Sequence, residues 1–133
     1  MDSIEDALLI ALDAHKDQKY GDKEYIWHVL KVASYSVGEK DLIVALLHDV
    51  IEDSDYTAED LSKHFSKEVV DAVVAISRVE GEAKAKYTKR VKGNTLALQV
   101  KVFDVLSNRE ACIAEGNIKR ANKYDKLLED LGY

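Results

Sequence analysis

The stretch Leu46-Leu47-His48-Asp49-Val50-Ile51-Glu52-Asp53 places four ionisable side chains in the most apolar helical segment of the chain. On one continuous helix, His48 and Glu52 are four residues apart, as are Asp49 and Asp53, so both pairs should project to one side. Burying an imidazole and three carboxylates is costly unless they are paired, protonated or bound to a cation. A divalent cation would remove the repulsion between the carboxylates and would account for the pattern.

A solvent-exposed acidic helix end is the simpler alternative for this stretch, with its carboxylates as solvated charges. Two other residues decide between these interpretations. His28 lies on an apolar helix face, where a lone histidine is commonly a hydrogen-bonded core residue, and Asp104 lies three residues after Lys101, an ion-pair spacing. Together with His48 and Asp49, they would supply two imidazoles and two carboxylates. Such donors, without thiolate, suit Mn, Fe, Co or Zn better than Ca or a Cys-rich zinc site.

The rest of the chain predicts an all-α bundle of about seven to eight helices. Its 133 residues include no proline and six glycines, which favours helices joined by short turns, and the length fits one domain. Apolar residues indicate helices over 3–19, 26–37, 42–53, 57–65, 68–78, 96–115 and 117–131. The β-branched run within 68–78 also resembles a strand, but its length favours a helix. The polar, basic residues 79–93 predict a mobile or partly helical segment.

Composition excludes several classes of partner. With 19 Lys and Arg against 25 Asp and Glu, the net charge of −6 argues against duplex nucleic acid. The longest apolar run has six residues, Leu42 to Leu47, against about 20 for a membrane span. The acidic N-terminus is unlike a signal peptide, and the single cysteine, Cys112, suits a reducing cytosol, so we expect a cytoplasmic protein that binds no membrane. The five cations within 84–92 are placed to steer a polyanion, or form a solvated loop.

The order His…His-Asp…Asp resembles the HD-domain phosphohydrolases. Longer segments resemble the hydrolase domain of RelA/SpoT homologues, especially the small stand-alone alarmone hydrolases. The resemblance is carried by Ala14-His15 with Gln18, Tyr25-Ile26 with His28, Ala45 to Asp53, Val100-Lys101 with Asp104 and Asn108, and Lys119-Arg120 with Lys123-Tyr124 and Leu127. These segments run from about residue 7 to 131, so the resemblance implies one HD hydrolase domain over residues 1–133.

The resemblance implies an HD-domain helical bundle that removes pyrophosphate from the 3′ position of guanosine tetra- or pentaphosphate, with manganese as the metal. It assigns metal binding to His28, His48, Asp49 and Asp104, handling of the attacking water to Glu52 and Asp53, and substrate contacts to Lys19, Tyr20, Lys101 and Asn108. The implied partner is a small phosphorylated nucleotide. An oligomer is compatible with the sequence.

Several positions depart from the family pattern. Residues 18–24 lack the arginines and the proline of the family, Val29 replaces the common proline, and Ser107 replaces a common histidine or tyrosine. An adenosine analogue or another 3′-phosphorylated nucleotide is therefore also open as substrate, with Tyr87 and Tyr124 as candidates for stacking on the base. Two alternative functions remain: an HD-type nucleoside monophosphate phosphatase and a non-catalytic nucleotide-binding module.

Overall fold

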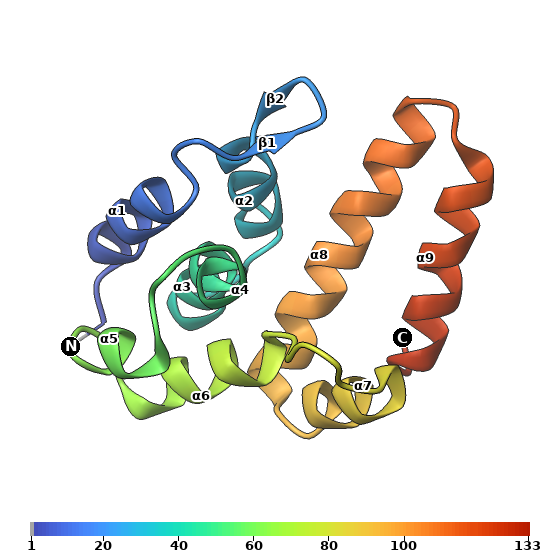
Figure 1. Ribbon diagram of the computed structural model, residues 1–133. Helices are drawn as coiled ribbons and strands as arrows, with labels where there is room; N and C mark the ends of the chain where they lie inside the picture. The colour runs from blue at the N-terminus through green and yellow to red at the C-terminus, as the bar shows by residue number, and fades with distance from the viewer. Residues whose placement is uncertain (1) are drawn as a thin grey trace.

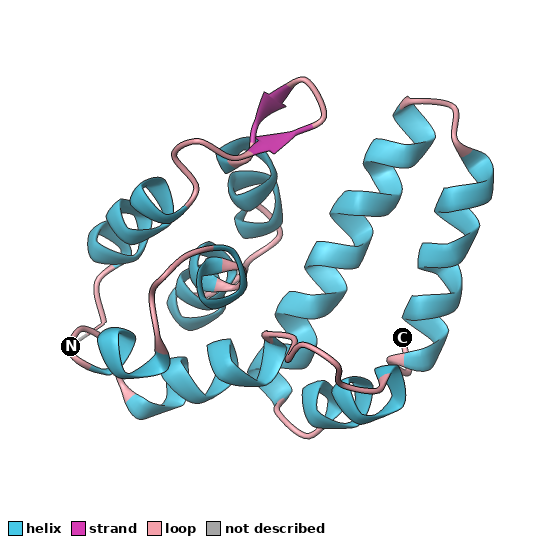
Figure 2. Cartoon of the chain, in the orientation of Figure 1, coloured by secondary structure: helices cyan, strands magenta, loops and turns pink. Residues whose placement is uncertain are grey.

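Helix α3 (Glu39–Leu47) lies at the centre of the computed structural model, which describes residues 2–133 (Figure 1). It packs against α1 (Ile4–Ala14), α2 (Ile26–Ala33), α6 (Lys67–Ile76) and α8 (Thr95–Ala114). Ile43 to Leu47 are all buried, as the apolar sequence of this helix predicts. Each large aliphatic side chain buried there contributes about 1.5–3 kcal/mol. The predicted all-α class is confirmed, since the only strands among the described residues form one short hairpin (Figure 2).

The single helix predicted over 42–53 is in fact two helices. After α3, the chain turns at His48 and Asp49 before α4 (Val50–Asp53) begins. The backbone of Asp49 lies at φ −106° and ψ 1°, outside the helical region. Helix α4 keeps the four-residue spacing, because the Asp53 N–H donates to the Asp49 carbonyl at 3.0 Å. Neither proline nor glycine marks the break between α3 and α4, and the Asp49 side chain at this turn accepts a hydrogen bond from the Tyr25 hydroxyl.

A hairpin follows α1 where the sequence predicts more helix. The helix predicted over 3–19 ends at Ala14, and β1 (Lys19–Tyr20) then pairs antiparallel with β2 (Lys23–Glu24). Gly21 lies in the turn with φ +63°, a conformation that glycine adopts without strain. Strands of two residues are too short to show an alternating pattern in the sequence.

The short connecting helices follow the local signals closely. The capping box at Thr57 is confirmed, because its hydroxyl accepts from the Asp60 backbone and the Asp60 carboxylate accepts from the Thr57 backbone, at the start of α5 (Ala58–Ser62). The β-branched run within 68–78 is helical, as predicted, and forms α6. Helix α2 is shorter than its predicted range of 26–37.

The C-terminal part forms a second, smaller core. The segment 79–93 contains a helix of nine residues, α7 (Lys84–Lys92), whose Tyr87 and Val91 are buried. They pack with residues of α8 and α9 (Ile118–Asp130), two helices that lie side by side (Figure 1). Helix α8 also contacts α2, α3 and α6, so it joins the two cores. No helix within residues 2–133 is both long enough and apolar enough to span a bilayer.

Candidate metal centre

Side chains from three separate helical segments meet between the two cores. His28 comes from α2, His48 from the C-terminal end of α3, and Asp104 from α8. One potential ligand atom from each lies within 4.8 Å of the others. His28 Nε2 is 2.9 Å from Asp104 Oδ1, and His48 Nε2 is 3.6 Å from the same oxygen. All three side chains are almost completely buried.

Asp49 extends this group from the turn after α3. Its Oδ2 lies 3.0 Å from His48 Nε2 and accepts a hydrogen bond from the Tyr25 hydroxyl. Sequence reasoning gives no role to Tyr25. Its position three residues before His28 places both on one helix face, a signal that could have identified it. Burial, with the negative charge of Asp49, raises the pKa of Tyr25 far above its ordinary value, so this hydroxyl remains a donor.

The two nitrogens of His48 have different surroundings. Nδ1 lies 2.6 Å from the carbonyl oxygen of Ala45, an arrangement in which Nδ1–H donates. Nε2 is buried and has no hydrogen-bond partner among residues 2–133, although oxygens of Asp49 and Asp104 lie close to it. A histidine whose second nitrogen is held by a carbonyl presents its free nitrogen as a metal ligand. Imidazole nitrogens and carboxylate oxygens facing one point therefore fit a divalent transition-metal ion.

Electrostatics also favours a cation at this position. Burial acts to lower the pKa of His48, but the carboxylates of Asp49 and Asp104 outweigh it and raise that pKa well above its usual value. Burial acts to raise the pKa of Asp49, but the positive charge on His48 outweighs it and lowers that pKa to about 2. Burial likewise opposes ionisation of Asp104, but the hydrogen bond from His28 and the nearby positive charges of His48 and Lys101 hold its pKa well below its usual range. Both carboxylates are thus ionised at neutral pH, the form that binds metal.

A cavity of about 270 Å³, here called the inner cavity, opens at this group. Its walls include eight of the predicted site residues: Tyr20, His28, His48, Asp49, Glu52, Lys101, Asp104 and Asn108. They also include residues that the sequence did not indicate as part of a site, among them Tyr25 and Arg78. The other two predicted residues, Lys19 and Asp53, do not line it.

Glu52 and Asp53 are adjacent in sequence but lie in different surroundings. Glu52 lines the inner cavity, where its Oε1 accepts a hydrogen bond from the backbone N–H of Arg78. Asp53 instead accepts from Gln18 Nε2 at 3.0 Å and lies 4.0 Å from His15 Nδ1, outside that cavity. Because neighbouring residues of a helix point about 100° apart, only Glu52 of this pair lines the inner cavity.

Tyr20 and Asn108, two of the predicted substrate-contact residues, are hydrogen-bonded to each other. The Tyr20 ring stacks on His28 with centroids 4.6 Å apart, and its hydroxyl donates to Asn108 Oδ1 at 2.5 Å. Asn108 Nδ2 lies 3.4 Å from Asp104 Oδ1. Burial, with smaller contributions from nearby groups, raises the pKa of Tyr20 to about 12. Lys19, in contrast, is an exposed residue of the hairpin.

Lys101 lies deeper in the cavity wall, next to the acidic group. Its Nζ is 3.3 Å from Asp104 Oδ2. Burial acts to lower the pKa of Lys101, but the charge of Asp104 outweighs it and the pKa is raised. Lys101 is therefore a permanent positive charge beside the proposed ligand Asp104.

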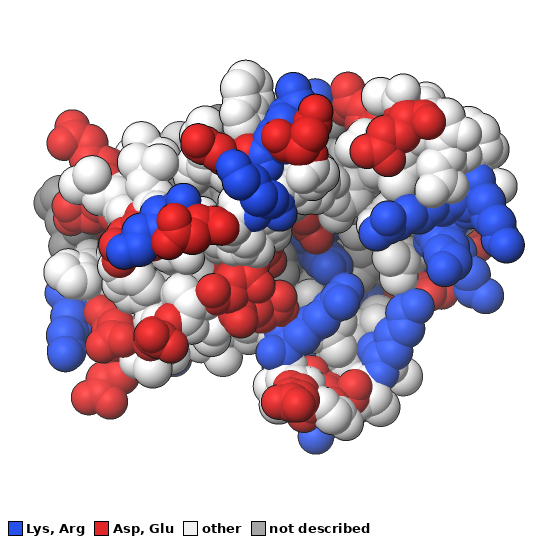
Figure 3. All heavy atoms as spheres, turned by 45° about the horizontal axis from the view of Figure 1, so that its top comes forward, with Lys and Arg blue, Asp and Glu red and all other residues white. Residues whose placement is uncertain are grey.

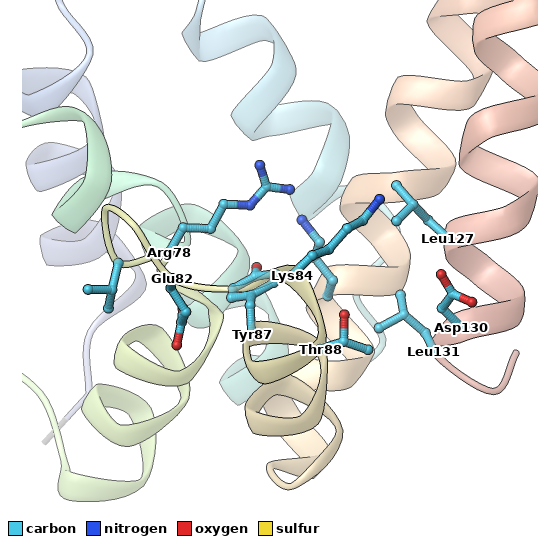
Figure 4. Close-up of a pocket in the computed structure, with 10 residues that line it drawn as sticks. Arg78, Glu82, Lys84, Tyr87, Thr88, Leu127, Asp130 and Leu131 are labelled. Carbon is cyan, nitrogen blue, oxygen red and sulfur yellow. The ribbon is translucent and has the colours of Figure 1, made fainter.

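A second cavity of about 380 Å³, here called the outer cavity, adjoins the first between α7 and α9 (Figure 4). The two cavities share four lining residues: Arg78, Tyr87, Lys101 and Leu127. The remaining walls of the outer cavity are Val79, Glu82, Lys84, Thr88, Asp130 and Leu131. A molecule bound at the acidic group can extend into this second space without crossing the core.

Charge is unevenly distributed along the chain. Residues 1–77 carry 7 Lys and Arg against 17 Asp and Glu, whereas residues 78–133 carry 12 against 8. The net charges are thus −10 and +4, which add to the −6 of the whole chain. Figure 3 shows Lys and Arg side chains gathered over the α7–α9 side. An anionic ligand is therefore attracted to that side despite the overall negative charge.

Comparison with known proteins gives one family. A family model described as "HD domain" matches residues 7–106. A Vibrio cholerae protein named guanosine-3′,5′-bis(diphosphate) 3′-pyrophosphohydrolase is 36% identical over 85 residues, covering 60% of this chain and 12% of the relative. The Escherichia coli protein named bifunctional (p)ppGpp synthase/hydrolase SpoT is 37% identical over 82 residues, covering 58% and 12%. A probable GTP pyrophosphokinase of Mycobacterium leprae is 34% identical over 141 residues, covering 95% and 18%.

The chain spans 12% to 18% of the length of these curated relatives. Among solved structures, one described with the words "A metazoan ortholog of SpoT hydrolyzes ppGpp and plays a role in starvation responses" superposes with a TM-score of 0.80. It is 23% identical, and the match covers 96% of this chain and 84% of that one. The two proteins therefore share a fold.

Proposed function

Because this chain belongs to the HD domain family, we propose that it is a metal-dependent hydrolase that removes the 3′-pyrophosphate from a guanosine or adenosine tetra- or pentaphosphate. The observation that carries the proposal is the group His28, His48 and Asp104, whose ligand atoms lie within 4.8 Å of one another beside a cavity whose walls include Arg78 and Lys101. The names of several curated relatives support this reaction class.

We further propose that residues 1–133 form one hydrolase domain, since α8 packs against both cores. The enzyme would act in the cytoplasm, where a buried free thiol such as that of Cys112 stays reduced. The proposal allows either guanine or adenine as the nucleobase of the substrate, because the hairpin that carries Tyr20 lacks the arginines of the family.

For the metal we propose Mn²⁺, held by His28, His48, Asp49 and Asp104. The unpartnered Nε2 of His48 and the ionised carboxylates support this ligand set. When bound, such an ion lowers the pKa of a water molecule in contact with it and neutralises charge on a phosphoryl oxygen.

Tyr25 has a testable role in this set. Its hydroxyl donates to Asp49 and orients that carboxylate toward His48. We expect Tyr25→Phe to weaken Mn²⁺ binding by about 10- to 10²-fold, because partners of metal ligands have effects of that size. Titration calorimetry with MnCl₂ measures this affinity directly.

Tyr56→Phe is the matched control. It removes a tyrosine hydroxyl that donates to Asp13 at 2.8 Å, on the surface and outside the inner cavity. Equal Mn²⁺ affinities for the two variants would show that the Tyr25 hydroxyl does not orient the metal ligand.

Glu52 is the residue proposed to handle the attacking water. It lines the inner cavity, and the Arg78 backbone fixes one of its oxygens. Burial raises the pKa of Glu52, and the hydrogen bond from Arg78 only partly offsets that shift. A carboxylate with a raised pKa is a stronger base toward water. Asp53 has no part in this step, since its carboxylate lies at Gln18.

The proposed reaction is a simple hydrolysis. The water oxygen bonds to the phosphorus nearest the ribose, and the bond between that phosphorus and the 3′ oxygen breaks. Glu52 accepts the proton that the water loses, and the departing 3′ oxygen takes up a proton. The products are intact pyrophosphate and a nucleotide with a free 3′-hydroxyl. Lys101 is placed to stabilise negative charge that develops on the phosphoryl oxygens.

Product analysis tests this function. With Mn²⁺ present, we expect one pyrophosphate for each guanosine or adenosine 3′-diphosphate consumed, and no release after the metal is removed with EDTA. Release of orthophosphate from a nucleoside monophosphate would instead support the phosphatase alternative. Binding of the 3′-diphosphate without turnover would support the non-catalytic module.

A further inference from the structure

Three cationic side chains surround the buried ring of Tyr87, where the inner and outer cavities meet. Arg78 and Arg90 each place their guanidinium carbon 5.3 Å from the ring centroid, and Lys101 Nζ lies 5.5 Å from it. The Tyr87 hydroxyl donates to the carbonyl of Ile76 at 2.6 Å, which fixes the ring at the end of α6. Three cationic groups therefore lie at the junction between the cavities.

Two of these cations already have partners. Arg90 pairs with Glu82 and also donates to the carbonyls of Ala75 and Ser77. Lys101 pairs with Asp104. The Arg78 guanidinium, in contrast, makes no ion pair or hydrogen bond with any residue in the described chain, 2–133, although it lines both cavities. Figure 4 shows its side chain extending above Tyr87, away from Glu82.

The backbone explains why this guanidinium points there. Helix α6 ends at Ile76, and Ser77 leaves it in an extended conformation with φ −80° and ψ 131°. The backbone N–H of Arg78 then donates to Glu52 Oε1, so the main chain of Arg78 is anchored at the water-handling carboxylate. Its side chain is free to extend over Tyr87 and toward the outer cavity.

We propose that Arg78 binds the terminal phosphate of the substrate's 3′-diphosphate and thereby selects a diphosphate over a monophosphate; this rests on the proposed function. The proposed metal ligands line only the inner cavity, whereas Arg78 also lines the outer one. A single phosphate at the ligands leaves the guanidinium unpaired. A second phosphate, one P–O–P link further, reaches it and accepts two parallel hydrogen bonds from its planar fork.

Binding of inorganic pyrophosphate and inorganic phosphate, at one fixed free concentration of Mn²⁺, tests this role without any turnover. The wild-type protein should bind pyrophosphate more tightly than phosphate. Arg78→Gln should lose about 10- to 10²-fold in pyrophosphate affinity, the size expected for charge-assisted hydrogen bonds. Its phosphate affinity should not change. Arg78→Lys keeps the positive charge but not the planar guanidinium. Its pyrophosphate affinity should lie between those of the wild type and Arg78→Gln.

Lys63→Met is the matched control, because Lys63 is an exposed cation at the end of α5 that lines neither cavity. It should bind both anions like the wild type. The proposal is overturned if the wild type does not prefer pyrophosphate, if Arg78→Gln binds pyrophosphate as Lys63→Met does, or if Arg78→Gln loses affinity for both anions equally. Absence of alarmone hydrolysis would refute the proposed function alone, since the binding comparison remains interpretable.

Discussion

Replacing His48 by alanine should abolish Mn²⁺ binding and lower hydrolysis by at least about 10³-fold, because the metal contributes several kcal/mol to the reaction. His48 Nε2 lies within reach of both Asp49 and Asp104, at 3.0 and 3.6 Å, so it is central to the proposed ligand set. Without it, two ionised carboxylates remain close together with no cation between them. Calorimetric titration with MnCl₂ and a pyrophosphate-release assay measure the two effects.

His64→Ala is the matched control for this variant. His64 is exposed on the surface after α5, so its removal should leave metal binding unchanged. Loss of a fully buried imidazole also leaves a cavity, which lowers stability. Asp104→Asn therefore serves as a second variant, since it keeps the side-chain volume and replaces the carboxylate with a neutral amide. Full Mn²⁺ affinity in both His48→Ala and Asp104→Asn would contradict the proposed centre.

The ligand types could be inferred from the sequence because burying them has an energetic cost. His48 and Asp49 interrupt an apolar helix, and a buried charge needs a partner. His28 and Asp104 also interrupt apolar faces, so only their joint occurrence was informative. Their convergence at one point is a property of the fold, and it depends on α2, α3 and α8 packing together.

The turn at Asp49 shows where reasoning from the sequence fails. Nothing local breaks the helix there, and the sequence predicts one helix over 42–53 where the structure has two. Contacts from distant residues decide the outcome, since Tyr25 holds Asp49 and Gln18 holds Asp53. Tertiary contacts of this kind override the local helical pattern.

Helix α7 is a second element that local sequence signals do not define. Its sequence is polar and basic, so little apolar periodicity is available to predict it. The helix is held instead by two buried side chains, Tyr87 and Val91, and by Arg90 bonds to the end of α6. Arg78 could not be identified earlier either, because its importance comes from the junction of two cavities that only the fold creates.

Glu52→Gln should leave Mn²⁺ affinity unchanged and lower turnover by at least about 10²-fold, the usual contribution of a general base. The amide keeps the size of the side chain and can still contact the Arg78 backbone, but it cannot accept a proton from water. Glu52 is not one of the proposed metal ligands, so the variant should lose turnover without losing Mn²⁺ affinity. Calorimetry and steady-state pyrophosphate release measure these two quantities.

The pH dependence gives an independent signature of the same residue. Burial raises the pKa of Glu52, so its carboxyl keeps a proton to a higher pH than an ordinary glutamate. A base must be ionised to act, and the wild-type rate should therefore fall as the pH drops through this raised pKa. Asp53→Asn lies on the same short helix but outside the inner cavity. This variant should keep the wild-type turnover and the same fall in rate at low pH. Wild-type turnover in Glu52→Gln, or an equal loss in Asp53→Asn, would mean that another group accepts the proton.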